Sequence, residues 1–98
     1  ILNHIHINKF FLGTTGITIE HGITTLDLLE ASMYKALLKA SEELIVVADH
    51  SKFGKVALAP ITEMKNVSKI ITDKGISLEN IKKFKDYEVE IIIIEPKE

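Results

Sequence analysis

The stretch IVVADHSKFGK, from 45 to 55, decides how the rest of the sequence is interpreted. It opens with an apolar run, which is typical of a strand that is buried on both faces of a parallel sheet. The run ends abruptly in four polar residues, Asp49, His50, Ser51 and Lys52. Because ligands of open α/β sheets bind outside the carboxyl ends of the strands, this transition is a candidate binding position.

Helices and strands alternate around this stretch. Apolar residues spaced by three and four predict an amphipathic helix over 26–43, with Thr24 or Thr25 as its N-cap. We expect strands at 5–12, 44–48, 56–58, 69–72 and 87–94. We also expect a helical turn at 61–65 and a short helix from 77 or 78 to 84. Pro60 interrupts the strand pattern, and Pro96 ends the last strand. The segment 13–25 predicts a glycine-rich loop with a short extended piece at 17–19. This order predicts an α/β domain with a mostly parallel sheet flanked by helices.

Composition narrows the class of protein. The chain has 98 residues, of which 46% are hydrophobic and 27% are charged, as expected for one globular domain over 1–98. It has no cysteine, which excludes a disulfide framework and a thiolate zinc site. A net charge of −2 gives this chain no basic excess for holding DNA. Apolar runs of only a few residues predict no membrane span, so we expect a cytoplasmic protein without a membrane partner.

Three polar segments follow predicted strands, at 13–25, 49–52 and 72–75. In the second, Lys52 supplies a compact positive charge with three donors, and Ser51 adds a hydroxyl. Asp49 could accept from a sugar hydroxyl or hold Lys52 in place. A phosphorylated sugar would satisfy all three side chains. The alternative is that Asp49 and Ser51 only cap a turn and that Lys52 is solvated.

Four segments of the sequence, in this order and at these spacings, resemble the C-terminal sensor domain of DeoR-type bacterial sugar-metabolism repressors. They are FFLGTTGITIEHGITT, LLEASMYKALLKAS, VVADHSKFG and IITD. The resemblance runs from about Asn8 to Asp73, and its most specific part is Asp-x-Ser-Lys-Phe-Gly. It implies a fold similar to ribose-5-phosphate isomerase and the CoA transferases, and we expect this chain to lack the N-terminal part of that fold.

The resemblance also implies a function. Such a domain binds a phosphorylated sugar or a related metabolite, and this binding alters how an N-terminal helix-turn-helix holds operator DNA. We therefore expect the C-terminal portion of a sensor domain, with operator DNA bound only through a domain outside this chain. The resemblance implies an oligomeric protein, so a homo-oligomer is expected, and no cofactor is expected.

The resemblance carries functional residues onto positions of this sequence. Asp49, Ser51 and Lys52 match the Asp-x-Ser-Lys signature, so Lys52 would approach the effector phosphate. The implied effector-binding set is Gly13, Thr14, Thr15, Gly16, Gly22, Glu30, Asp49, Ser51 and Lys52. Thr72 and Asp73 match the Ile-Thr-Asp end of the later strand. The sequence departs from the family at Asn8, where Asp is usual, and at His50, where Ser is commoner and where we expect a solvated histidine.

An isomerase is the first alternative to a sensor. Isomerases of this fold use a helix glutamate as the base, and Glu30 would be its counterpart. They also carry aspartates in the first loop and a lysine after it. Here Thr14 and Thr15 stand at the acidic positions, and His21 or a neighbour stands at the lysine position. A glutamate without these partners should bind ligand but turn it over poorly, so no enzyme is expected.

Two further alternatives concern metal binding and assembly. His4 and His6 would share one face of a strand, but no third ligand is evident, so polar positions on an edge strand explain them more simply and no metal is expected. The apolar segment 89–94 must be covered on both faces, either by a subunit partner or by another part of the same protein. A pure oligomerisation domain without a ligand therefore remains an alternative.

Overall fold

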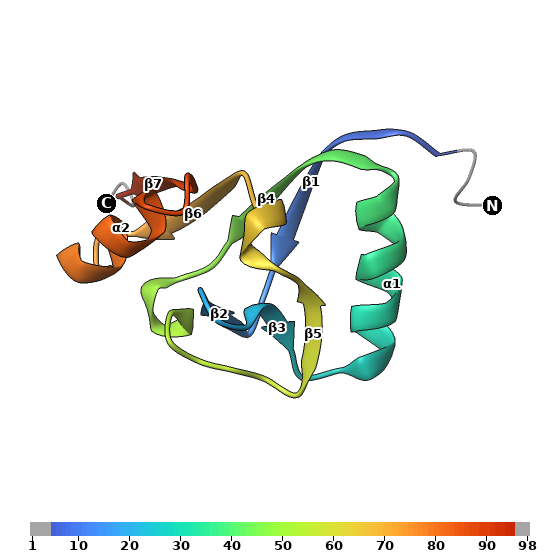
Figure 1. The fold of residues 1–98 in the computed structure, drawn as a ribbon, viewed down its shortest axis with the longest axis horizontal. Helices are drawn as coiled ribbons and strands as arrows, with labels where there is room; N and C mark the ends of the chain where they lie inside the picture. Colours follow the sequence, from blue (N-terminus) through green and yellow to red (C-terminus); the bar gives the residue numbers. More distant parts are fainter. Residues whose placement is uncertain (1–4, 96–98) are drawn as a thin grey trace.

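The computed structural model describes residues 5–95, which form two sheets and two α-helices (Figure 1). The larger sheet has the strand order β1-β4-β6-β7 and is entirely parallel. Its strands are β1 (Ile7–Gly13), β4 (Ser41–Val47), β6 (Lys69–Asp73) and β7 (Glu90–Ile94). The helices are α1 (Leu28–Lys39) and α2 (Leu78–Lys85). The predicted α/β class with a mostly parallel sheet is confirmed.

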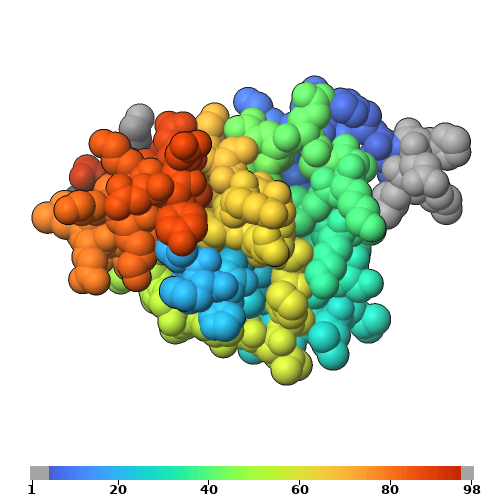
Figure 2. All heavy atoms as spheres, viewed as in Figure 1, coloured from blue at the N-terminus to red at the C-terminus, as the bar shows by residue number. Residues whose placement is uncertain are grey.

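A second, antiparallel sheet packs against the first. It has the order β2-β3-β5 and consists of β2 (Gly16–Thr18), β3 (Gly22–Thr25) and β5 (Ala59–Thr62). Two 3₁₀ turns, η2 (His50–Lys52) and η3 (Met64–Asn66), complete the described elements. In the space-filling view, the second sheet fills the space between α2, in orange, and α1, in teal (Figure 2). None of the helices within 5–95 is long and apolar enough to cross a membrane.

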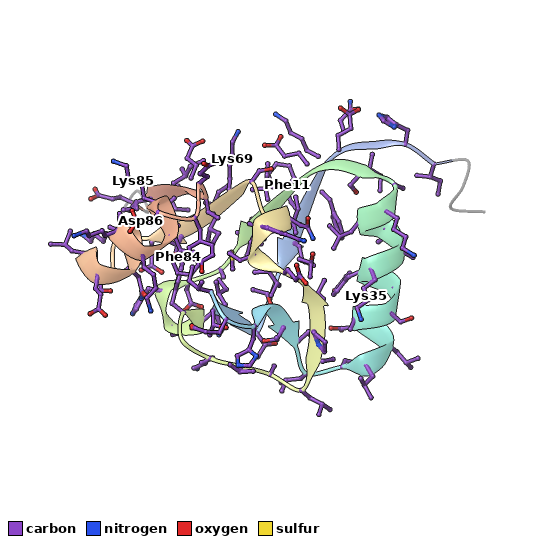
Figure 3. All side chains as sticks on the ribbon, in the orientation of Figure 1. Phe11, Lys35, Lys69, Phe84, Lys85 and Asp86 are labelled. Carbon is purple, nitrogen blue, oxygen red and sulfur yellow. The ribbon has the colours of Figure 1, made fainter. Side chains whose placement is uncertain are left out.

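The core lies between the two sheets. Several alternate residues of the parallel strands point into it, including Leu12, Val46 and Ile70, each with at most 2% of its surface exposed. Ile17 of β2 meets them from the second sheet. Phe84 of α2, labelled in Figure 3, closes the core from the side of α2. One layer of side chains thus joins both sheets and α2.

The helix α1 is shorter than predicted at both ends. Asp27 is its N-cap, and the Asp27 carboxylate accepts from the N–H of Leu29 at 2.8 Å. The predicted caps, Thr24 and Thr25, are wrong because both are buried in β3. At the other end, residues 41–43 belong to β4, where the ladder with β1 overrides their preference for a helix.

The loop predicted at 13–25 is mostly wrong, because most of it forms the hairpin of β2 and β3, although the short extended piece expected at 17–19 overlaps β2. Two of its glycines allow backbones to approach closely. Gly22 has a φ of +70°, and a Cβ there would overlap the carbonyl of Thr62 in β5. A Cβ on Gly16 would overlap the carbonyl of Lys55. The glycines therefore allow close backbone approach, to β5 at Gly22 and to the loop after η2 at Gly16, rather than loop flexibility.

The remaining boundaries shift by a few residues. The strand predicted at 56–58 is wrong, because β5 begins at Ala59 and includes Pro60, which a sheet tolerates in an edge strand. The turn expected at 61–65 forms at Met64–Asn66. The short helix and its Ser77 cap are confirmed, since Ser77 Oγ accepts from the N–H of Asn80 at 3.1 Å. Pro96 lies outside the described residues.

Candidate functional site

The four parallel strands end at one edge of the sheet, where their loops surround a hollow of about 430 Å³. Its floor is apolar and its rim is polar. The lining residues are Gly13, Thr14, Val47, Ala48, Asp49, Lys52, Ile71, Thr72, Asp73 and Ile94. We call this the strand-end hollow. Four residues of the predicted effector-binding set meet there, although they come from two segments more than thirty positions apart.

Lys52 lies at the end of η2, directly beyond β4. Its ammonium is 3.6 Å from a carboxylate oxygen of Asp49, and its side chain is only 33% exposed. Asp49 also caps the turn, because its other oxygen accepts from the N–H of Ser51 at 2.8 Å and from the Ser51 hydroxyl. These two bonds from Ser51, the hydroxyl first, lower the pKa of Asp49, and Lys52 adds to the effect. The carboxylate is therefore ionised and restrains the lysine.

Thr14, directly after β1, also lines the hollow. Its hydroxyl donates to the carbonyl of Thr24 at 2.7 Å, and the side chain is half-buried. A hydroxyl oxygen that donates its proton keeps lone pairs with which it can accept. Thr14 is therefore held in place by β3 and can still accept from a donor in the hollow.

The other predicted site residues do not line the strand-end hollow. Ser51 is turned into the Asp49 cap, and the N–H of Thr15 donates to the carbonyl of Thr24 at 3.3 Å. Gly16 and Gly22 allow close approach to the backbone of Lys55 and of Thr62, respectively. The effector roles of these four residues, and that of Glu30, remain predictions.

Glu30 lies in the first turn of α1. Its carboxylate accepts from the hydroxyl of Thr25 at 3.4 Å, a contact that joins α1 to β3. Since Glu30 is absent from the hollow, the geometry gives it no partner for isomerase chemistry there.

A larger hollow of about 590 Å³ lies beside α1, between Lys35, Lys39 and the segment at Ile5 and His6. It is formed by one helix and one extended segment, and no strand ends in it. Loops that follow several strands supply convergent polar groups, which is the arrangement expected of a ligand site in an α/β sheet. We therefore take the smaller strand-end hollow as the candidate site.

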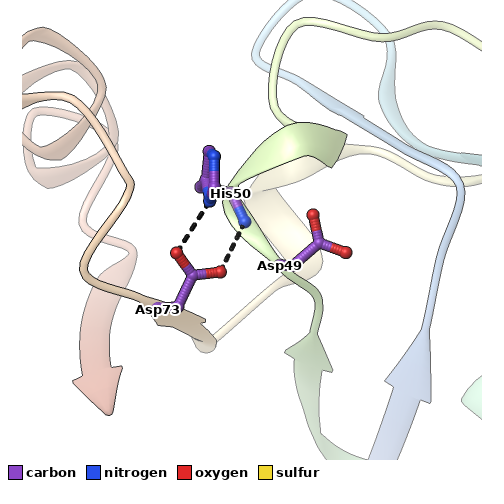
Figure 4. Close-up of side chains that lie close together, drawn as sticks. All are labelled: Asp49, His50 and Asp73. Atoms are coloured by element: carbon purple, nitrogen blue, oxygen red, sulfur yellow. Dashed lines mark hydrogen bonds and ion pairs between the residues drawn. The ribbon is translucent and has the colours of Figure 1, made fainter. Parts of the chain in front are cut away.

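Asp73 is the site residue that sequence reasoning left out of the effector set. One carboxylate oxygen accepts from the N–H of His50 at 2.9 Å (Figure 4). The other lies 2.7 Å from Nδ1 of His50 and accepts from the N–H of Gly75 at 2.8 Å. These bonds, with that of the His50 N–H first, lower the pKa of Asp73. The available signal was the Ile-Thr-Asp match combined with the adjacency of β4 and β6.

His50 differs from its expectation as a solvated histidine. Its side chain is 52% exposed, but the ring is bonded to Asp73. The ligand atoms of Asp49, His50 and Asp73 all lie within 4.8 Å of one another, a spacing that suits a metal. The carboxylates already receive hydrogen bonds from the protein itself, however, so the arrangement works as an internal clamp.

The two-histidine metal hypothesis gains no support. His4 lies outside the described residues, and His6 pairs through Nε2 with the carboxylate of Glu42 on β4. This pair joins the extended segment before β1 to the neighbouring strand. It therefore has a structural explanation.

Comparison with known proteins identifies the class. Residues 1–74 match the family described as the DeoR C terminal sensor domain, and the chain belongs to that family. This confirms the resemblance inferred from the sequence. The bacterial relatives described below are named as regulators or repressors of transcription.

Three relatives are informative. The HTH-type transcriptional regulator GolR of Listeria innocua is 32% identical over 97% of this chain and 37% of its own length. A putative aga operon transcriptional repressor of Escherichia coli O157:H7 is 31% identical over 95% of this chain and 35% of its own. The HTH-type transcriptional regulator IolR of Bacillus subtilis is 38% identical over 76% of this chain and 30% of its own.

The chain thus spans about a third of the length of these relatives. Their names describe regulators and repressors of transcription rather than enzymes, which agrees with the expectation that this domain is not an enzyme.

Proposed function

We propose that this chain is the effector-sensing part of a DeoR-type transcriptional regulator of sugar metabolism. It binds a phosphorylated sugar or a related metabolite and thereby modulates DNA binding by a separate helix-turn-helix. The observation that carries this proposal is the convergence of Lys52, Asp49 and Thr14 on one hollow at the carboxyl ends of the sheet.

The chemistry of the hollow suits such a ligand. The Lys52 ammonium offers three donors and a positive charge to a phosphate. The Asp49 carboxylate and the Thr14 hydroxyl offer acceptors to sugar hydroxyls. The apolar floor, which includes Val47 and Ile71, offers a surface to the C–H groups of a sugar. A volume of about 430 Å³ lies in the range typical of small-molecule sites.

Other parts of the full protein supply the DNA contact in this proposal. The net charge of −2 makes the chain itself a poor partner for a polyanion. GolR and IolR are named as HTH-type regulators, so a helix-turn-helix in the remainder of the protein is consistent with their greater length. We further propose that the protein works in the cytoplasm as a homo-oligomer, since two-fold operators are matched by two-fold proteins.

The test uses the longest natural protein that contains this chain. Its thermal unfolding is followed with ribose 5-phosphate, glucose 6-phosphate and the corresponding unphosphorylated sugars. A specific effector should raise Tm as its phosphorylated form only, because ligands that bind the folded state stabilise it. Operator binding, followed by gel shift, should change with the same compound. Equal stabilisation by a sugar and its phosphate would remove the phosphate contact from the proposal.

A further inference from the structure

The turn that carries Lys52 is held to the neighbouring strand by a side chain. Backbone pairing between β4 and β6 ends where the N–H of Ala48 donates to the carbonyl of Ile71 at 3.1 Å. Beyond that point, the Asp73 carboxylate accepts from the backbone of His50 at 2.9 Å, with the ring Nδ1 at 2.7 Å (Figure 4). The side chain of Asp73 thus continues the strand connection after the backbone connection stops.

Gly75 fixes the other side of the His50 ring. Its N–H donates to Asp73 at 2.8 Å. A Cβ built on Gly75 would overlap the ring, and its three nearest atoms are all ring atoms of His50. The imidazole therefore lies directly against a bare backbone. We call His50, Asp73 and Gly75 the β6 latch.

We propose that Asp73 is a positioning residue for the effector site and that it acts through His50 on Lys52. This inference rests on the function proposed above. Lys52 follows His50 by two residues within a single 3₁₀ turn, so a displacement of His50 moves the lysine backbone as well. Asp73 receives three hydrogen bonds from the protein, which leaves its carboxylate little capacity to bind a ligand directly.

The benefit of the latch is preorganisation. A turn held at both His50 and Asp49 presents the Lys52 ammonium in one place before the effector arrives. Without the latch, binding must also order the turn, and that cost lowers the affinity. The charge of Lys52 is the same in both cases, so the loss comes from geometry.

Electrostatic repulsion alone predicts the opposite change in affinity for a phosphate. Asp73 lines the hollow with a negative charge, and removing that charge should favour a phosphate. Positioning predicts weaker binding after Asp73→Asn, whereas simple repulsion predicts tighter binding. The direction of the change therefore separates the two roles.

Two variants and one rescue test the proposal in the longest natural protein that contains this chain, with ribose 5-phosphate and inorganic phosphate as probes. Asp73→Asn and Gly75→Ala should each weaken binding of the better probe by about tenfold, the effect of losing a good hydrogen bond. Hydrogen exchange of the His50 amide in the ligand-free protein should become faster in both. In a His50→Ser background, Gly75→Ala should have little further effect on either measurement, because the overlap with the ring is gone.

The outcomes separate the two proposals. Tighter binding by Asp73→Asn, or unchanged exchange at His50, would overturn the positioning role while leaving Lys52 as a phosphate contact. Faster exchange with unchanged binding would also overturn it. If the unaltered protein binds neither probe, the proposed effector fails and the positioning role fails with it. Weaker binding, faster exchange and rescue by His50→Ser together would support the latch.

Discussion

The ammonium of Lys52 lies 3.6 Å from the carboxylate of Asp49, three residues earlier in the same turn. Asp49 is itself fixed by Ser51, so the lysine is restrained by a group that does not depend on any ligand. A phosphate that enters the hollow would meet an amine that is already in place.

Replacing Lys52 with alanine is therefore expected to weaken binding of a phosphorylated effector by about 1.5–3 kcal/mol, the usual contribution of a hydrogen bond to a charged group. Isothermal titration of the longest natural protein with its effector measures this. Lys55→Ala is the matched control, because Lys55 is exposed in the same segment and does not line the hollow. Equal losses in both variants would point to general charge attraction.

Stability should fall in acid because of Asp49, which follows β4, and Asp73, the last residue of β6. Hydrogen bonds lower the pKa of both Asp49 and Asp73 in the folded protein. A group whose folded pKa is lowered stabilises above its unfolded pKa, and this stabilisation is lost as the pH falls through the folded value. The loss should therefore begin below the ordinary aspartate value of about 4.

Thermal unfolding between about pH 6 and pH 2 checks this window. In Asp73→Asn, Tm should fall less steeply as the pH is lowered, because the substitution removes one of the groups that must be protonated. Asp86→Asn, at the exposed end of α2, serves as the control. If the acid dependence of Tm stayed the same in Asp73→Asn and became weaker in Asp86→Asn, the contribution assigned to Asp73 would be refuted.

The sequence predicted the parallel strands because each contains a continuous apolar run rich in β-branched or aromatic residues. The small sheet was missed for a physical reason. Its strands are only three or four residues long, and Thr24 and Thr25 look like loop residues although both are buried. Their burial depends on pairing with β5, which is more than thirty residues away in the sequence. A local sequence pattern does not predict such pairing.

The candidate site, like the fold, could be predicted only in part. Residues 49–52 were visible as an apolar run that ends in polar side chains. The latch was not, because His50 and Asp73 are 23 positions apart and meet only when β4 and β6 pair. The sequence also suggested Glu30 through resemblance alone, and the fold places it on α1, away from the hollow.

Thr72 offers a test of the core beneath the site. It is 2% exposed, and its hydroxyl oxygen has no hydrogen-bond partner among residues 5–95. Thr72→Val keeps the shape and removes the unsatisfied group, so it should raise the free energy of unfolding by about 1 kcal/mol. Denaturant unfolding measures the change.

Thr24 is the matched control for Thr72. It is 3% exposed, but its hydroxyl oxygen accepts from the N–H of Ala57 at 2.9 Å. Thr24→Val leaves that donor unpaired and should lower the free energy of unfolding by about 1–3 kcal/mol. The same substitution is thus expected to have opposite signs at two buried positions. Destabilisation of similar size at both would show that the Thr72 hydroxyl is in fact satisfied.

Gly22 and Gly54 separate backbone strain from steric overlap. Both have positive φ, +70° and +87°. A Cβ on Gly54 would meet nothing within 4 Å, so Gly54→Ala should cost only the left-handed strain of about 1–2 kcal/mol. Gly22→Ala adds overlap with the carbonyl of Thr62 and should cost clearly more. Equal changes in the denaturant midpoint would mean that β5 moves aside without penalty.

The outer face of the parallel sheet should bind apolar probes in this chain. Phe11, Val47 and Ile94 are 57%, 42% and 53% exposed and alternate with residues that point into the core, and the last two also line the strand-end hollow. An all-parallel sheet is normally covered on both faces, so we expect this surface either to be covered by another part of the protein or to promote self-association.

Phe11→Ser should lower the fluorescence of bound anilinonaphthalene sulfonate and reduce self-association in sedimentation. It should lower Tm only modestly, because more than half of the residue's surface is exposed. A large fall in Tm would show instead that Phe11 packs against something in the folded chain.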